Sequence, residues 1–288
     1  VDPQYPQALS DGATGALVVV TAPGDEVELS LRPEIAADGT ATRTWRPLDA
    51  PGGLAVAAVP PTEVSSLGSV RYRVFRGGAE VTTTGPDGRG REDGTSPAIP
   101  LTWLRPEPPP APGDGMREIE IEHLLTQLGL PLDDVTVAVP WSGDVPGPHD
   151  RPARVTVLAV TVPSGAVYVS TVYGYATGTE GVVVGSTCGS EILPAGEPSA
   201  QRAIALRCDV TDGTASSDAV SSLVVLSPAG AVSARALDLT GEVLAEFPLT
   251  DGVTVVPAPE RTATVETLAA DGAVRDTARL LTFAHLGD

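Results

Sequence analysis

Three histidines, His123, His149 and His285, are the first residues to consider as catalytic groups. An imidazole activates a serine or cysteine that lies beside it, and the serine of many hydrolases occupies a Gly-x-Ser-x-Gly turn. The chain contains no such turn. Asp150 could orient the ring of His149, but a solvated loop histidine is the simpler interpretation. We therefore expect no catalytic residues, and a hydrolase on a β scaffold ranks third among the hypotheses for function.

Two cysteines, Cys188 and Cys208, are the only thiols. Two thiols alone cannot form a structural zinc site, and no pair of histidines stands near them in the sequence. In a β protein without other cysteines a disulfide is the simplest interpretation, and it would indicate an oxidising compartment. The alternative is a pair of buried, reduced thiols in a cytosolic protein.

A possible cation loop runs from Asp209 to Asp218 and gathers Asp209, Asp212 and Asp218 around a glycine. Carboxylate oxygens are ligands that Ca²⁺ prefers. The spacing departs from that of an EF-hand loop, because Thr211 occupies the third position and no glutamate closes the loop. An Asp/Gly turn is the alternative, so calcium is a possible ligand and no tight site is expected.

Two further groups of polar side chains could bind a ligand. Glu118, Glu120 and Glu122 alternate with isoleucines, so on a strand they would share one face, where they could bind a cation or form a solvated edge. Tyr173 and Tyr175 are two positions apart and would share a strand face. Such a face could stack a sugar or a peptide, and the alternative is a pair of tyrosines half-buried in a sandwich.

The charge balance excludes some classes of function. The chain has 37 acidic residues and 18 basic residues, and every basic residue is an arginine, for a formal net charge of −19. Binding to nucleic-acid phosphates or anionic lipids needs clustered cations, so neither is expected. The absence of lysine excludes Schiff-base, pyridoxal-phosphate and P-loop chemistry. No apolar stretch approaches the roughly 18 residues that span a membrane.

Glycine turns between apolar runs indicate the fold class. Five glycines stand just ahead of a valine at such turns, where a positive φ followed by a β-branched residue is typical of a hairpin. They are Gly78, Gly165, Gly230, Gly241 and Gly272. Residues 15–104 contain about seven short strand-like runs, as a β-sandwich requires. In one of them Val70, Tyr72 and Val74 alternate with Arg71 and Arg73, the pattern of a half-buried strand.

Composition divides the chain into parts. Five prolines lie within residues 105–115, which predicts a stiff spacer between an N-terminal β-sandwich domain (1–104) and a C-terminal β domain (116–288). The second domain could be two small β units divided near residues 216–220. Residues 161–167 resemble residues 226–232 at an offset of 65 residues, which a duplication or shared turn chemistry could explain. Residues 123–129 predict a short helix that ends at Gly129.

The sequence therefore predicts an all-β protein of tandem immunoglobulin-like β-sandwich domains with at most one short helix. The expected function is that of a non-catalytic structural or protein-interaction module of a secreted or cell-envelope bacterial protein. The expected partner is another protein or an envelope component, the location is extracytoplasmic, and no cofactor is expected. The alternative is a ligand-binding module for carbohydrate or calcium. No motif assigns the chain to a family.

Overall fold

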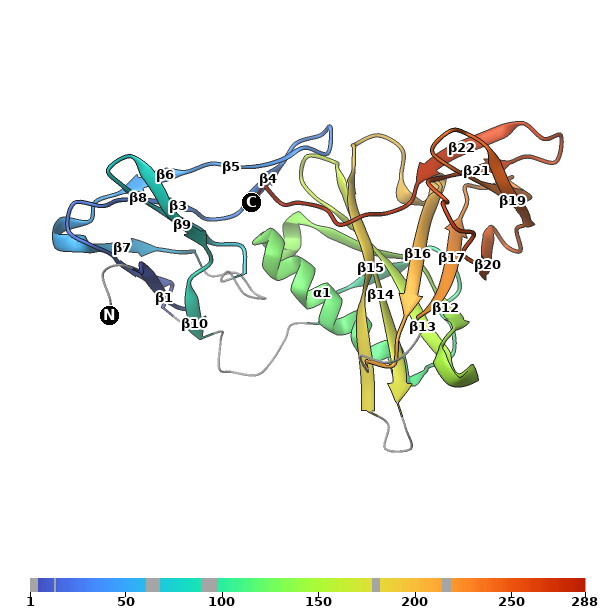
Figure 1. The fold of residues 1–288 in the computed structure, drawn as a ribbon, viewed down its shortest axis with the longest axis horizontal. Helices are drawn as coiled ribbons and strands as arrows, with labels where there is room; N and C mark the ends of the chain where they lie inside the picture. The colour runs from blue at the N-terminus through green and yellow to red at the C-terminus, as the bar shows by residue number, and fades with distance from the viewer. Residues whose placement is uncertain are drawn as a thin grey trace.

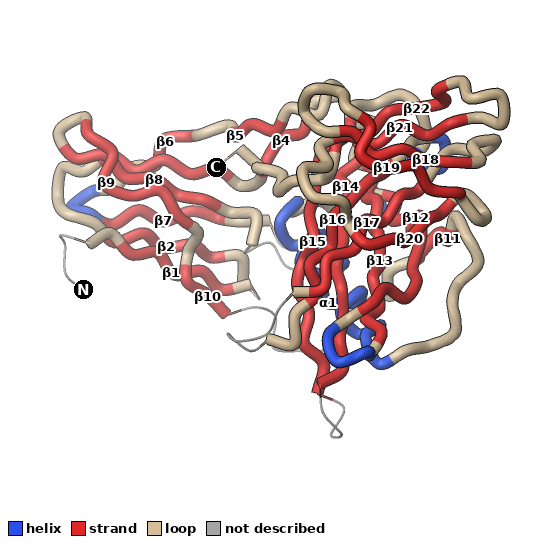
Figure 2. The backbone as a smooth tube through the Cα atoms, turned by 45° about the vertical axis from the view of Figure 1, so that its right-hand side comes forward, coloured by secondary structure: helices blue, strands red, loops and turns tan. Residues whose placement is uncertain are grey.

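The computed structural model describes residues 5–12, 14–60, 68–89, 98–177, 182–213 and 219–287 (Figure 1). These residues form a smaller β unit at the N-terminus and a larger body that holds the one α-helix of the described part. The prediction of an all-β fold built from sandwich-like layers is confirmed. Figure 2 shows how strands dominate both parts.

The N-terminal unit consists of two packed four-stranded sheets. Their strand orders are β10-β1-β2-β7 and β6-β3-β8-β9. Tyr72 and Val74 point into the core between the sheets, whereas Arg71 and Arg73 lie on the opposite face, as their alternation predicted. The strands are β1 (Gln7–Asp11), β2 (Ala16–Val20), β3 (Glu26–Ser30), β6 (Arg46–Leu48), β7 (Leu54–Ala58), β8 (Arg71–Arg76), β9 (Ala79–Thr84) and β10 (Asp87–Arg89).

An ion pair closes one end of this unit. Arg76, the last residue of β8, donates from Nε and Nη2 to the carboxylate of Asp25 at 2.9 and 2.7 Å. The backbone N–H of Ala22 and the hydroxyl of Thr21 donate to the same carboxylate. The Arg76 guanidinium, aided by Thr21 and Ala22, holds the pKa of Asp25 well below its usual range.

Replacing Asp25 with asparagine is expected to destabilise the N-terminal unit at neutral pH by about 1.5 kcal/mol, the order of one charge-assisted hydrogen bond. Because the pKa is lower in the folded state, the carboxylate contributes its full stability above its unfolded pKa, near 3.8, and loses it as the pH falls further. Urea unfolding of wild type and Asp25→Asn at pH 7 and below pH 3 measures this. A difference in stability that does not shrink at the lower pH would contradict it.

A two-stranded arm, β4 (Pro33–Ile35) and β5 (Ala41–Arg43), links the N-terminal unit to the larger body. At the turn of this hairpin the carbonyl of Ala37 accepts a 2.6 Å hydrogen bond from the N–H of Ala195. The C-terminal segment runs back beside the arm, and its Leu286 is buried in the core beneath the helix (Figure 1). The arm and the C-terminal segment therefore hold the two parts together.

The larger body is built on a five-stranded sheet with the order β11-β12-β13-β14-β15. Its members are β11 (Leu101–Trp103), β12 (Thr136–Pro146), β13 (Pro152–Thr161), β14 (Val167–Thr177) and β15 (Val182–Leu193). β11 pairs in parallel with β12, so residues 101–103 belong to this sheet and not to the N-terminal sandwich in which the sequence analysis placed them. Residues near 98–104 therefore lie in the larger body.

One face of this sheet is covered by helix α1 (Gly115–Leu128). Leu124, Leu125 and Leu128 pack against Leu158 and Val160 of β13. The prediction that residues 118–122 form a strand is wrong, because they lie within α1. The helix ends where Gly129 takes a left-handed conformation with φ +59°, as predicted for a glycine stop.

Two further sheets are stacked on the other face. The three-stranded sheet β16-β17-β20 packs directly on the five-stranded sheet. The four-stranded sheet β19-β18-β21-β22 packs on the opposite face of the three-stranded sheet. β16 and β17 pair along their whole length, so the predicted division near 216–220 falls between two strands of one sheet. The strands are β16 (Ile204–Val210), β17 (Val220–Leu226), β18 (Ser233–Leu237), β19 (Val243–Pro248), β20 (Val253–Pro257), β21 (Thr264–Leu268) and β22 (Val274–Arg279).

All five predicted turn glycines have a positive φ, between +81° and +84°. Four of them connect paired strands, as hairpin glycines should. Gly230 is different, because it connects β17 to β18, which belong to different sheets. Gly165 connects β13 to its partner β14. The similarity between residues 161–167 and residues 226–232 therefore reflects a shared turn sequence in two connections of different kinds.

The proline-rich segment 105–115 packs against the larger body. Arg105 donates to the carbonyls of Pro140, Ser227 and Gly252 at 2.9 to 3.2 Å. Further along, Arg154 of β13 donates to the carbonyl of Pro109 at 3.1 Å. This segment therefore joins β11 to α1 within one body and does not act there as a spacer.

Short 3₁₀ turns connect several of these elements at Pro51–Gly53, Pro112–Asp114, Leu132–Asp134, Pro148–Asp150 and Ser199–Gln201. Within the described ranges, no helix combines the length and the apolar composition that crossing a bilayer requires.

Candidate functional site

The predicted disulfide between Cys188 and Cys208 is confirmed. It joins β15, the edge of the five-stranded sheet, to β16, the edge of the three-stranded sheet. Cys208 is completely buried in the core between the two sheets. The bond therefore fixes the position of one layer on the other.

Tyr173 and Tyr175 do not form the exposed ligand face that the sequence allowed, because they are only 5% and 1% exposed. The alternative, tyrosines buried between sheets, is the one that the structure shows. The three-stranded sheet covers the face of β14 on which they lie. Tyr175 donates its hydroxyl hydrogen to the carbonyl of Pro148 at 2.8 Å, and the N–H of Thr211 donates to the Tyr173 hydroxyl at 3.3 Å. Both rings therefore anchor loops at one end of the body.

Two residues of the possible cation loop, Asp209 and Asp212, have protein partners. Burial alone would raise the pKa of Asp209, but hydrogen bonds from Ser221 and Arg207 outweigh it and lower that pKa. Asp212 lies 3.3 Å from Nε2 of His149, and Asp218 lies outside the described residues. No group of three or more potential metal ligands occurs in the part of the chain that the structure describes.

The three glutamates predicted to share a strand face are separated by the helix. Glu120 is buried, whereas Glu118 and Glu122 are exposed on other sides of α1. The hydroxyl of Ser170 donates to Glu120 Oε1 at 2.6 Å, and His123 Nδ1 lies 3.7 Å from Oε2. This contact raises the pKa of His123. Because Ser170 is 1% exposed, this cluster offers a substrate no nucleophile.

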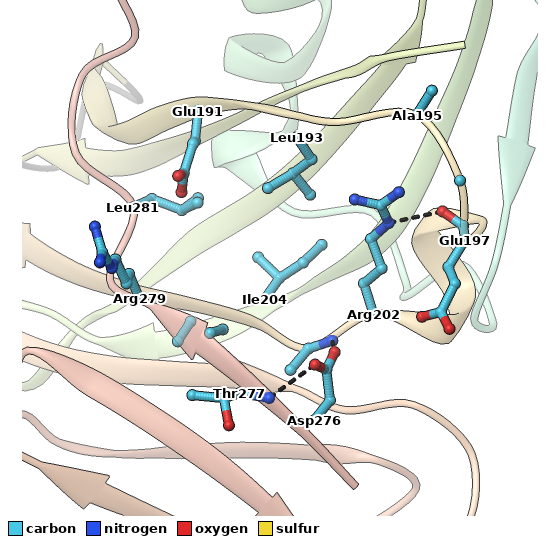
Figure 3. A pocket seen from close by; sticks show the side chains of 14 residues that line it. Glu191, Leu193, Ala195, Glu197, Arg202, Ile204, Asp276, Thr277, Arg279 and Leu281 are labelled. Carbon is cyan, nitrogen blue, oxygen red and sulfur yellow. Dashed lines mark hydrogen bonds between the residues drawn. The ribbon is translucent and has the colours of Figure 1, made fainter. Parts of the chain in front are cut away.

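A pocket of about 520 Å³ opens where β15, β16 and β22 come together (Figure 3). Each of these strands is the edge of a different sheet. Its apolar lining includes Leu193, Ile204 and Leu281. Its charged lining residues are Glu191, Glu197, Arg202, Asp276 and Arg279.

Two of these charged side chains, Asp276 and Arg202, form hydrogen bonds with backbone groups. The Asp276 carboxylate accepts from the N–H groups of Ala203 and Thr277 at 2.6 and 2.7 Å. Arg202 donates to the carbonyls of Glu197 and Pro194, both at 2.6 Å. These bonds hold the β15–β16 connection and the start of β16 against β22, so they shape the pocket wall.

Of the other three, Glu197 is exposed, and Glu191 and Arg279 carry opposite charges. The half-buried carboxylate of Glu191 points into the pocket and Arg279 approaches it from β22 (Figure 3). Burial raises the pKa of Glu191, and the positive charge of Arg279 offsets part of that rise. Among the described residues, no hydrogen bond or ion pair joins either side chain to another group.

Sequence analysis missed this pocket, because β15 and β16 form it together with β22, which comes much later in the chain. One signal was present in β15, since Glu191 is the only charged residue of that 12-residue strand. A lone carboxylate in a strand of valine, glycine and small polar residues indicates a local polar role.

A second surface feature lies on the N-terminal unit. The outer face of the sheet β10-β1-β2-β7 carries Leu9 and Val56, each 64% exposed, and Leu54, 48% exposed. Leu9 pairs in register with Val18, and Val18 pairs with Val56. These apolar side chains therefore form a continuous row across three strands, which ends at the edge strand β7.

The fold and these two surfaces define an all-β protein of stacked sheets with a pocket at a junction of sheet edges. No family model matches the chain, and no curated protein matches it either.

Proposed function

We propose that this chain is a non-catalytic protein-interaction module of a secreted or cell-envelope protein, and that it binds an extended segment of a partner protein along β7. Extended segments bind sheet edges through main-chain hydrogen bonds, while pockets for alternate side chains add specificity. The observation that carries this proposal is the open, uncharged edge of β7 around Val56.

Natural edge strands are commonly protected by charge, proline or bulges. β7 has the sequence Leu-Ala-Val-Ala-Ala, which contains no charged residue, proline or bulge. Arg46 of the facing sheet donates to the carbonyl of Ala58 at the end of the strand, at 3.3 Å. Among the edge strands of five or more residues in the described part, each of the others contains a charged residue or a proline. β9 contains Glu80, for example, and β20 ends in Pro257.

The backbone of β7 is oriented to receive another strand. Val59 N–H donates to Gly15 and Thr21 N–H donates to Gly53, so the odd-numbered residues of this region bond toward β2. Backbone groups alternate along an antiparallel ladder, so the N–H and carbonyl of Val56 and the carbonyl of Leu54 project outward. The N–H of Leu54 donates to the carbonyl of Pro51. An added strand would extend the apolar row that Leu9, Val18 and Val56 form.

Charge favours a different protein over a second copy. Two chains that each carry −19 repel one another, and the repulsion is strongest at low salt. A neutral or basic segment with aliphatic side chains avoids this cost. The disulfide supports an extracytoplasmic location for the encounter, since such bonds persist in oxidising compartments.

A library of displayed random peptides, selected on the whole protein, tests the proposal. We expect enriched peptides to alternate aliphatic residues and to bind at least about tenfold more weakly to Val56→Lys, a loss of about 1.4 kcal/mol. Val81→Lys is the matched control, because Val81 is an exposed valine on the edge strand β9. Hydrogen exchange should slow at Val56 when a peptide binds.

Two outcomes would overturn the proposal. Peptides that bind Val56→Lys as tightly as wild type would place the contact elsewhere on the molecule. A concentration-dependent dimer in sedimentation that disappears in Val56→Lys would assign the edge to a second copy of the chain.

A further inference from the structure

We infer that the pocket between β15 and β22 binds a small zwitterion with an apolar body, in which an ammonium group pairs with Glu191 and a carboxylate pairs with Arg279. A free amino acid and a dipeptide both carry this chemistry. The inference goes beyond the proposed partner binding, because it concerns the opposite part of the molecule and none of the residues of β7.

The size and lining of the pocket suit such a ligand. Ligand sites are usually concave, largely apolar and between about 300 and 1,000 Å³, with a few polar groups that fix orientation. This pocket of about 520 Å³ has Leu193, Ile204 and Leu281 among its lining residues, together with four alanines. An aliphatic side chain would bury its surface against them, at about 25 cal/mol per Å².

The hydrogen bonds within the pocket leave three charged side chains for a ligand, which are Glu191, Arg279 and the exposed Glu197. Asp276 is held by backbone N–H groups and Arg202 by backbone carbonyls, so both serve the wall. In the described part of the chain Glu191 and Arg279 have no such bonds, although they carry opposite charges and line the same pocket. A ligand that spans the space between them satisfies both.

Glu191 gains more from this pairing than Arg279 does. The arginine is exposed and water solvates it, whereas the carboxylate is half-buried and its pKa is raised by burial. A carboxylate with reduced hydration gains from a cationic partner. The net charge of −19 also favours the approach of an ammonium group. The ammonium contact is therefore the main source of affinity, and the carboxylate contact orients the ligand.

Calorimetric titration of the whole protein with four compounds at pH 7 tests this inference. L-leucine and L-leucyl-L-leucine carry both charges, N-acetyl-L-leucine lacks the ammonium group and L-leucinamide lacks the carboxylate. We expect the better of the two zwitterions to bind with a millimolar or lower Kd. Each compound that lacks one charge should bind at least about tenfold more weakly, and the acetylated one most weakly. The preferred zwitterion identifies the source, amino acid or peptide.

Two substitutions and a control locate the binding. Glu191→Gln and Arg279→Gln should each weaken zwitterion binding at least about tenfold. Arg275→Gln should not, since Arg275 is an exposed arginine on the same strand and does not line the pocket. Near-ultraviolet circular dichroism verifies that each variant is folded. With Glu191→Gln, the preference for leucine over its acetylated form should disappear.

The pH dependence gives an independent measurement. Binding to the ammonium group requires ionised Glu191, so affinity should fall as the pH is lowered, beginning above the usual glutamate pKa of 4.5. The other charged groups that line the pocket are Arg279, Arg202, Glu197 and Asp276, and the Glu191→Gln variant should lose this dependence. A Kd of 10 mM corresponds to a binding free energy of only about 2.7 kcal/mol. Failure of both zwitterions to bind at that concentration would overturn the inference. Equal binding of N-acetyl-L-leucine, or unchanged binding by Glu191→Gln, would overturn it too.

Discussion

Replacing Gly174 with alanine is expected to destabilise the larger body by about 2 kcal/mol, within the usual cost of overpacking. Gly174 lies in the middle of β14, where the proline-rich segment crosses it. A Cβ atom at this position would lie 2.6 Å from Cα of Gly113. At Gly113 a Cβ atom would meet the carbonyl oxygen of Gly174 at 2.5 Å. Because the obstruction is backbone on both sides, no side-chain rotation relieves it.

The matched control is Gly115→Ala, at the first residue of α1. A Cβ atom there meets nothing within 4 Å, and alanine is the better helix former, so we expect a neutral or slightly stabilising effect. Urea unfolding of the two variants measures the difference. Equal stability of Gly174→Ala and wild type would mean that segment 112–114 can leave the sheet without cost.

Reduction of the disulfide is expected to lower the free energy of unfolding by about 3 kcal/mol in the chain-entropy model. The bond joins Cys188 and Cys208, which are 20 residues apart in the chain. Urea unfolding with and without a thiol reductant measures the effect. The Cys188→Ala/Cys208→Ala variant is the control, since it contains no cysteine and its unfolding midpoint should not respond to reductant.

Loss of the disulfide should also change local hydrogen exchange. The bond links β15 to β16, so its loss should increase hydrogen exchange at those two strands before it does so in the N-terminal unit. A change of less than 1 kcal/mol on reduction would contradict the prediction. It would mean that the apolar core between the two sheets holds them in place without the bond.

Local features of the fold could be predicted from the sequence. A glycine ahead of a valine has a local conformational requirement, and all five such glycines adopt the expected positive φ. The alternation around Tyr72 is likewise a property of one strand. The cysteine pair was predictable because no other thiol competes for either partner.

Features that depend on remote segments could not be predicted in the same way. Five alternating residues fit both a strand and a helix, and Ile121 is buried in α1 while Ile119 is 59% exposed. The alternation of Tyr173 and Tyr175 assigns them to one face, but the sheet that covers this face comes from residues 204–257. The pocket depends on the same long-range arrangement. The sequence shows that Glu191 is the lone charged residue of its strand, but it does not show that this residue lines a pocket.

The position of Arg105 has a consequence for how the chain reaches its native state. Its guanidinium is held by carbonyls at Ser227 and Gly252, which are synthesised long after it. These two hydrogen bonds of Arg105 can therefore form only after most of the remaining chain has been synthesised. Contacts so distant in sequence slow folding and prolong the exposure of unpaired strands. The larger body is thus completed late, whereas the N-terminal unit, whose strands all precede residue 90, can form while synthesis continues.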